Sequence, residues 1–229
     1  METLNNMKLF VEKKRRAPRQ EVPQILSRVS EVVSGYVFRG KLKEAEQLAA
    51  EVAATKRKEL GEEHPDTLTA MYILVSTYED QERWKEAEEL AEKIMDTRMK
   101  MLGEDHLDTL GSMGYLSGIF AKQGWWEEAE QLERRLVEAG ERKFGGEHVF
   151  TLIGKDHLAE TFREQRKWKE AEELERQILE TRKTVAGRVH PHTVISMHNL
   201  AFTLMAQGRL KEAELLSTEI KQAEMRKHN

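Results

Sequence analysis

Histidine and glutamate are the residue types in this chain that could support metal binding or acid–base chemistry. The chain has eight histidines and no cysteine, so disulfides, thiolate metal sites and a cysteine nucleophile are excluded. Four histidines recur at intervals of 42 residues, at His64, His106, His148 and His190. Equivalent residues of stacked helices lie on the order of 10 Å apart, whereas the ligands of one metal ion lie about 2 Å from it. We therefore predict that these histidines cap helices, and that the chain binds no metal ion and no cofactor.

The recurrent glutamates are not paired as catalytic carboxylates. They are spaced by the same 42 residues and form the series Glu44, Glu86, Glu128, Glu170 and Glu212. Each belongs to a run of charged residues, as expected for a solvated helix face with ion pairs three or four residues apart. The chain also lacks a phosphate-binding glycine loop, a nucleophile elbow and a zinc-protease motif. We predict that the protein is not an enzyme and has no catalytic residues.

One heptapeptide returns along the chain. The stretch Trp84 to Leu90 reads WKEAEEL, and close copies begin at Leu42, Trp126, Trp168 and Leu210. The central alanines form the series Ala45, Ala87, Ala129, Ala171 and Ala213. A fixed period of this size is typical of stacked copies of one supersecondary unit, each of which contacts only its neighbours.

Each repeat is predicted to contain two helices. In the second repeat, apolar residues at spacings of three and four run from Leu68 to Tyr78 and resume at Trp84. The first helix begins after His64 with Pro65, where the missing N–H costs nothing. The second helix is expected to end at a glycine in a left-handed cap. The glycines expected to form these caps are Gly61, Gly103, Gly145 and Gly187.

The repeat frame divides the chain into an N-terminal segment and five helix pairs. Residues 1–21 are predicted to form a capping helix and a linker. The predicted repeats, which together cover 22–229, are 22–63, 64–105, 106–147, 148–189 and 190–229. Because the last repeat has no successor to cover it, either its polar tail 221–229 shields its apolar face, or Leu215, Leu216 and Ile220 leave an adhesive end. This end could support a homo-oligomer.

Composition favours an all-α protein that binds neither nucleic acid nor membranes. Charged residues make up 34% and hydrophobic residues 39% of the chain, with only four prolines, a profile typical of amphipathic helices. The formal net charge is −4, so no global positive field attracts phosphate backbones. No apolar run reaches the roughly 20 residues of a membrane helix, and no secretory signal is evident. A cytoplasmic location is expected. The basic run 13–16 fits a solvated helix end, with a nuclear address as the alternative.

These residues resemble the tetratricopeptide repeat (TPR). An aromatic residue ends the first helix at Tyr36, Tyr78, Phe120 and Phe162, and a small residue begins the second helix in the alanine series. The 42-residue period, with LGEEHPDTL at 60–68 and RWKEAEEL at 83–90, is similar to the kinesin-light-chain type, which also occurs in arrays attached to fungal and bacterial signalling ATPases. The resemblance covers about 22–229. It implies a right-handed α-solenoid in which the first helices line a concave groove that binds a peptide or partner protein.

The first helices supply the candidate contacts of that groove. Three glycines, Gly111, Gly114 and Gly118, share one helix face at spacings of three and four, although each costs about 0.8 to 1 kcal/mol relative to alanine. We expect a partner to approach closely there, although the glycines could also be sequence drift or face another helix. The other predicted contacts are Tyr72, Tyr115, Asp156, His157, Arg163, His198 and Asn199.

The resemblance also implies asparagines in the first helix that hydrogen-bond the backbone of a bound peptide. At the matching positions this chain has Tyr72-Ile73, Gly114-Tyr115, Asp156-His157 and His198-Asn199. Only Asn199 keeps the family residue, so the ligand is expected to differ from the usual peptide.

Trp125 is a further interface candidate. Its equivalents in the other repeats are the basic residues Lys41, Arg83, Lys167 and Arg209, so its side chain is expected to be exposed, and exposed aromatic residues often anchor interfaces. The first functional hypothesis is therefore a protein-binding scaffold. The second is an oligomerisation or sensor segment of a larger signalling ATPase. The third, a small-molecule-binding or catalytic helical domain, would require an enclosed polar pocket.

Overall fold

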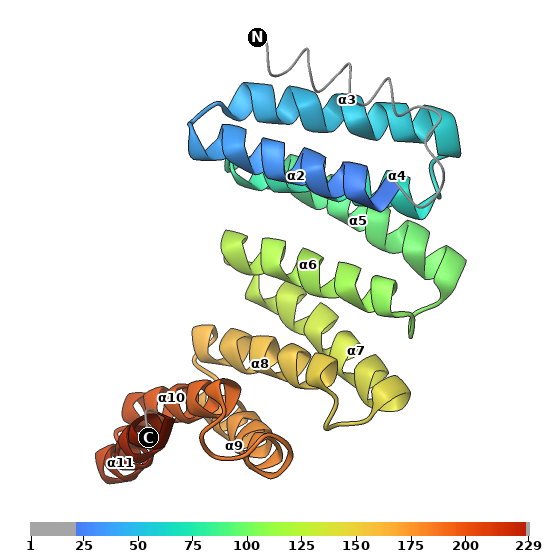
Figure 1. Cartoon of the computed structure of the whole chain (residues 1–229). Helices are drawn as coiled ribbons and strands as arrows, with labels where there is room; N and C mark the ends of the chain where they lie inside the picture. Colours follow the sequence, from blue (N-terminus) through green and yellow to red (C-terminus); the bar gives the residue numbers. More distant parts are fainter. Residues whose placement is uncertain (1–21, 228–229) are drawn as a thin grey trace. The chain divides into compact units, whose positions relative to one another are not determined.

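The computed structural model describes residues 22–227, which form ten α-helices and no strand (Figure 1). The prediction of an all-α repeat fold is confirmed. The predicted capping helix lies in residues 1–21, outside the described residues, and the right-handed winding stays a prediction. The helices are α2 (Val22–Phe38), α3 (Leu42–Leu60), α4 (Pro65–Glu79), α5 (Trp84–Leu102), α6 (Leu107–Gln123), α7 (Trp126–Phe144), α8 (Val149–Glu164), α9 (Trp168–Val185), α10 (Pro191–Ala206) and α11 (Leu210–Lys227).

The chain forms two compact units that divide within α6, between Ile119 and Phe120. In the first unit α3 packs against both α2 and α4, and α4 packs against α5. In the second unit each helix from α7 to α11 packs against the next helix in the chain. Each helix pair thus buries its apolar face against a neighbouring pair, as in other repeat arrays.

The recurrent histidines cap the first helices, which confirms the prediction. Each immediately precedes a helix, and its Nδ1 accepts a hydrogen bond from the backbone N–H two residues later. The backbone of His64, His148 and His190 is extended. The N···N distance is 3.1 Å at His64, 3.2 Å at His106 and His148, and 3.3 Å at His190. This bond satisfies one of the backbone donors that a helix start leaves without a partner.

The glycines that end the second helices have positive φ, but the predicted left-handed cap is wrong. Gly61 has φ 92° and ψ 167°, Gly103 has 85° and 167°, and Gly145 has 89° and 161°. In these three glycines ψ is extended rather than helical, and this region is accessible essentially only to glycine. This conformation leads directly into the first helix of the following repeat. A threonine of that helix is hydrogen-bonded to the glycine: the Thr67 hydroxyl donates to the Gly61 carbonyl at 2.8 Å.

The alanine of the repeated heptapeptide is a core residue. Ala45, Ala87, Ala129 and Ala171 are completely buried, so a larger side chain at these positions would separate the helices. The last repeat follows the same pattern. Leu216 and Ile220 are buried in a cluster with Leu179, Met197 and Leu200. Leu216 and Ile220 are therefore not exposed as expected, and of the three residues only Leu215 is exposed. Self-association through this end stays a prediction.

Ion pairs link successive repeats on the outer surface. Arg83 contacts Glu46 at 2.7 Å, and Lys167 contacts Glu130 at 2.6 Å. Arg209 contacts Glu172 at 2.6 Å in the same register. Because these pairs are partly exposed, each contributes at most about 1 kcal/mol. At the equivalent position the third repeat has Trp125.

Among residues 22–227, no helix combines the length and apolarity that a membrane crossing requires.

Candidate functional site

The predicted contacts lie on one face of the first helices, which we call the A-face. We define it by five positions per helix, illustrated in α10 by Ile195, His198, Asn199, Phe202 and Met205. Spacings of three and four residues place these positions on one side of a helix. Five of the ten predicted contacts belong to the first unit and five to the second.

In the first unit, two predicted contacts form an aromatic pair. The rings of Tyr72 and Tyr115 meet edge to face with centroids 5.1 Å apart. The guanidinium of Arg98 lies 4.9 Å from the centre of the Tyr72 ring and donates to the Ser112 hydroxyl at 3.1 Å. Burial raises the pKa of Tyr72. Burial and the neighbouring Glu79 raise the pKa of Tyr115, whose hydroxyl donates to the Glu79 carboxylate. The pair is therefore held protonated and fixed in place.

The three A-face glycines lie in α6. Gly111 is exposed, and Gly114 and Gly118 are half-buried. A Cβ built on Gly111 or Gly118 would meet no atom within 4 Å. No neighbouring side chain therefore requires glycine at these two positions, and they leave room for a partner or for a methyl group.

Gly154 in α8 has the opposite surroundings. A Cβ built there would lie 2.3 Å from Cδ2 of Leu136 and 3.4 Å from Cγ2 of Val137. Both contacts come from α7, so this glycine allows α7 and α8 to pack closely. Sequence reasoning did not identify Gly154. Its equivalents Ala70, Ser112 and Ser196 are all small, which is the signal that could have found it.

The two classes of glycine predict opposite effects of one substitution. Gly111→Ala is expected to raise the free energy of unfolding by about 0.8 to 1 kcal/mol, because alanine is the better helix former. Gly154→Ala gains the same propensity but forces Leu136 to move, at a cost of about 1 to 3 kcal/mol, so it is expected to lower the stability. Urea unfolding followed by circular dichroism measures both. Equal shifts of the same sign would contradict the prediction.

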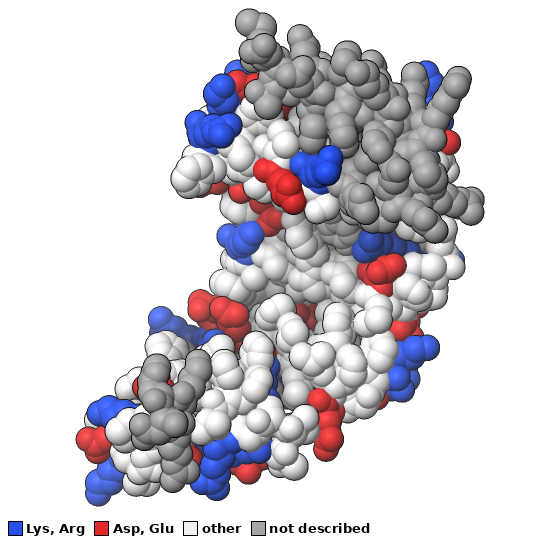
Figure 2. Space-filling view, in the orientation of Figure 1, with Lys and Arg blue, Asp and Glu red and all other residues white. Residues whose placement is uncertain are grey.

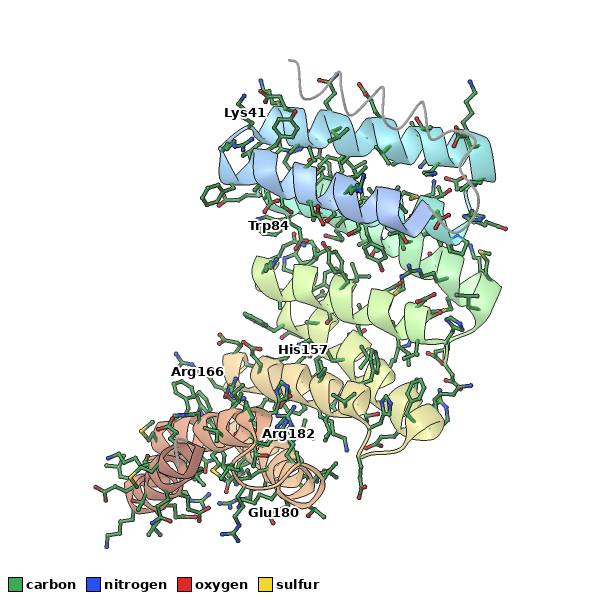
Figure 3. All side chains as sticks on the ribbon, in the orientation of Figure 1. Lys41, Trp84, His157, Arg166, Glu180 and Arg182 are labelled. Atoms are coloured by element: carbon green, nitrogen blue, oxygen red, sulfur yellow. The ribbon has the colours of Figure 1, made fainter. Side chains whose placement is uncertain are left out.

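In the second unit, Asp156 is held by a buried arginine from the neighbouring helix. Arg182 of α9 donates to the Asp156 carboxylate through both terminal nitrogens, at 3.1 Å for the Nη1–Oδ1 contact. It also donates to the Ser196 hydroxyl in α10 at 2.7 Å. Figure 3 labels Arg182, which lies close to both α8 and α10. Arg182 therefore connects three helices, and its partner Asp156 also lies on the A-face.

Arg163 also pairs with a buried residue. Its Nη1 lies 2.7 Å from the Glu175 carboxylate, whose side chain is 2% exposed. Burial raises the pKa of Glu175, and the positive charge of Arg163 opposes this effect. The guanidinium also lies 5.9 Å from the centre of the Phe202 ring. Sequence reasoning missed Glu175, although the series Ala49, Ala91, Glu133, Glu175 and Ser217 shows two successive repeats with glutamate where the others have a small residue.

The exposed part of the A-face in the second unit has four apolar side chains beside the carboxylate of Glu160. Ile153, Ile195 and Met205 are about half exposed, and Phe202 is 54% exposed. The sequence analysis did not select these four residues. Their equivalents in the second repeat are the polar residues Thr69, Ser76 and Glu79, so the change from polar to apolar was the available signal. In Figure 2 the surface over α8 is largely uncharged.

The remaining predicted contacts of this unit add polar groups beside the apolar side chains. His157 (labelled in Figure 3) and His198 are exposed, and Asn199 is half-buried. A pocket of about 170 Å³ adjoins Ile153. It is bounded mainly by Val149, Leu152 and Val185, with Arg182 at its base. Apolar side chains beside imidazole and amide groups are suited to noncovalent recognition.

Trp125 is 44% exposed, as the sequence predicted. Its ring stacks on Phe120 with centroids 6.0 Å apart and planes inclined at 27°. This contact fixes the indole while leaving nearly half of its surface in solvent.

A family comparison matches the chain to the tetratricopeptide repeat model over residues 32–100, 74–142 and 156–220. A comparison with curated proteins finds no significant match. The solved structures include the nearly identical TPR-like repeats of a kinesin light chain from Podosopora anserina. That protein is 27% identical, with a TM-score of 0.78, and the match covers 90% of this chain and 97% of the other.

Two further structures share the fold at lower identity. BtubC from P. vanneervenii is 18% identical with a TM-score of 0.81, and the match covers 99% of this chain and 91% of that one. A STAND signal-transduction ATPase with a TPR sensor, from Pyrococcus horikoshii, is 15% identical with a TM-score of 0.70. The match covers 90% of this chain but only 31% of the ATPase.

Proposed function

Because this chain belongs to the tetratricopeptide repeat family, we propose that it is a protein–protein interaction scaffold that binds a peptide or partner protein on the A-face. The observation that carries the proposal is the exposed apolar surface of α8 and α10, formed by Ile153, Ile195, Phe202 and Met205. Such a surface is costly in water, and covering one side chain of this size contributes about 1.5 to 3 kcal/mol.

The pairing beneath this surface supports a preorganised site. Arg163 and Asp156 are each held by a buried partner in α9, so they lose little freedom when a ligand binds. The neighbouring side chains of His157 and His198 are exposed, and they can adapt to the ligand. We propose that the scaffold is cytoplasmic, has no catalytic activity, and binds neither nucleic acid nor membranes.

The ligand we propose is recognised by its side chains more than by its backbone. The asparagines expected from the resemblance are replaced by Tyr72, Gly114 and Asp156 at one position, and only Asn199 is kept at the other. The apolar surface and the adjoining pocket of about 170 Å³ instead favour a segment that carries aromatic or branched aliphatic residues. In the first unit, the space over Gly111 and Gly118 would admit a bulky ligand group.

Selection from a displayed library of random linear peptides tests this proposal. Wild-type protein is expected to enrich peptides with aromatic or aliphatic residues. Phe202→Ser is expected to weaken a selected peptide tenfold or more, because the lost burial corresponds to about 1.5 to 3 kcal/mol.

The matched control is Leu210→Ser, which removes an equally exposed apolar side chain outside the A-face and should leave the affinity unchanged. Unaltered affinity of Phe202→Ser, or the absence of enriched peptides, would refute the proposed site.

The second candidate function is an oligomerisation or sensor segment of a larger signalling ATPase. The observation in its favour is that Leu215 and Trp125 are exposed apolar residues outside the A-face. A mass that increases with protein concentration would favour self-association through this C-terminal end or through Trp125.

A further inference from the structure

The fifth repeat lacks an aromatic ring that the other repeats keep. The first helix of each earlier repeat ends with an aromatic residue, and the fifth repeat has leucine at this position. The series is Tyr36, Tyr78, Phe120, Phe162 and Leu204. In the fourth repeat the ring of Phe162 is buried and lies 5.1 Å beneath the guanidinium of Arg134. The ring therefore fills the space between two successive second helices.

A crevice occupies the corresponding place in the fifth repeat. It has a volume of about 300 Å³ and lies between α9 and α11. Leu179, Leu200, Leu204 and Leu216 form its apolar base, and Arg176 lies on its edge. Arg176 is the equivalent of Arg134. The crevice thus keeps the cation that covers the ring in the preceding repeat, whereas the ring is replaced by the smaller side chain of Leu204.

The rim of the crevice has a second departure from the repeat. Leu215 borders it and is 69% exposed, whereas the equivalent residues are Gln47, Glu89, Gln131 and Glu173. Three carboxylates also line the rim, from Glu180, Glu212 and Glu219, against the two cations Arg176 and Lys183. Figure 3 labels Glu180. The crevice therefore combines an apolar base with a rim that has one excess negative charge.

Phe38 has the complementary properties. It is the last residue of α2 and is 93% exposed, although the equivalent residues are Asp80, Lys122, Glu164 and Ala206. The basic residues Arg39 and Lys41 follow it, and Figure 3 shows Lys41 at the turn between α2 and α3. An exposed phenyl ring next to two positive charges matches an open crevice that is apolar at its base and acidic at its rim.

We propose that Phe38 of one copy inserts into the crevice of a second copy, where its ring takes the place that Phe162 has in the fourth repeat. The contact is heterologous, because it joins two different surfaces of the same chain, and such contacts form head-to-tail rings or open chains. One inserted side chain buries much less than the roughly 1,200 Å² of a stable interface. Association is therefore weak and visible only at high protein concentration.

Sedimentation equilibrium of the whole chain at protein concentrations of about 10 to 500 μM tests the proposal. An interface smaller than that of a stable complex is expected to associate in this range. The weight-average mass of the wild type is expected to rise with concentration and to fall back in high salt. Phe38→Ser removes the inserted ring, and Leu204→Phe fills the crevice with the ring of the other repeats. Each variant alone is expected to stay monomeric. Circular dichroism confirms that both variants fold.

A mixture of the two variants provides the decisive measurement. Phe38→Ser keeps the crevice and Leu204→Phe keeps Phe38, so the mixture is expected to form a one-to-one complex that cannot extend. A monomeric wild type, a Phe38→Ser variant that still associates, or a mixture that stays monomeric would overturn the proposal. Self-association through Leu215 alone would survive Phe38→Ser. The substituted residues Phe38 and Leu204 do not lie on the A-face, so this experiment is independent of the test of peptide binding there.

Discussion

Replacing Arg163 with methionine is expected to lower the free energy of unfolding by about 3 to 5 kcal/mol, because it leaves the Glu175 carboxylate buried without its cation. Glu175 is 2% exposed and Arg163 is 14% exposed, so water screens the pair only weakly. Urea unfolding at neutral pH measures the loss as a lower midpoint. As a control, Lys85→Met breaks the exposed pair with Glu89 and is expected to cost less than about 1 kcal/mol.

A double substitution separates the charge from the packing. Arg163→Met together with Glu175→Leu removes both members of the pair, and replacing a buried pair by apolar residues is often neutral or stabilising. The double variant is therefore expected to recover most of the stability that Arg163→Met loses. If it stays as unstable as the single variant, the packing of Arg163 matters more than its charge.

The pH dependence of this loss follows from the pKa of Glu175. Burial raises this pKa, and Arg163 opposes the rise. A carboxyl whose folded pKa is raised stabilises the fold below its unfolded pKa and loses this contribution as the pH rises through the folded pKa. Without Arg163 the pKa rises further, so the deficit of Arg163→Met is complete above the raised pKa of the variant. It is expected to shrink as the pH falls and Glu175 takes up a proton. A deficit independent of pH would contradict this explanation.

The local features of the fold could be predicted from sequence because they depend on few neighbouring residues. His64 caps its helix through a hydrogen bond from a backbone N–H two residues away. A histidine directly before the first helical residue of another repeat can accept the same bond. The glycine conformation was only partly predictable. A glycine at Gly61 signals positive φ, but its ψ depends on how the next helix docks, which the local sequence does not specify.

The candidate site was less predictable because its contacts join different helices. The A-face residues were chosen from their place in the repeat, which does not show that Asp156 and Arg163 are already paired with Arg182 and Glu175. Comparing the second helices as well as the first would have helped, since Glu175 and its equivalent Glu133 stand where the other repeats have the small residues Ala49, Ala91 and Ser217. Partner binding by the ten A-face residues stays a prediction.

In the middle of the chain all members of such a hydrogen-bonded set are replaced by glycine. Asp156, Arg182 and Ser196 form one hydrogen-bonded set, and the positions 42 residues earlier are Gly114, Gly140 and Gly154. A buried polar set with one member missing is worse than no set, which gives a physical reason for replacing all three. Gly114 then has an explanation that does not require a partner.

The same reasoning predicts a large effect at Asp156. Asp156→Ala is expected to lower the free energy of unfolding by about 3 kcal/mol, because the guanidinium of Arg182, which is 7% exposed, would keep only neutral hydrogen-bond partners. His157→Ala is the matched control. It lies one residue away on the same face but is exposed, so it is expected to change the stability by less than about 0.5 kcal/mol.

Two further variants test whether the buried charge of Arg182 causes this loss. The triple variant Asp156→Gly, Arg182→Gly and Ser196→Gly copies the preceding repeat, and it removes the buried charge together with its partners. It also introduces three helix glycines at about 0.8 to 1 kcal/mol each. If the buried cation causes the loss, Asp156→Ala should regain stability when Arg182→Leu is added, because no buried charge then remains. A further loss on adding Arg182→Leu would show that Arg182 stabilises the helices through Ser196 and the backbone of His192, independently of Asp156.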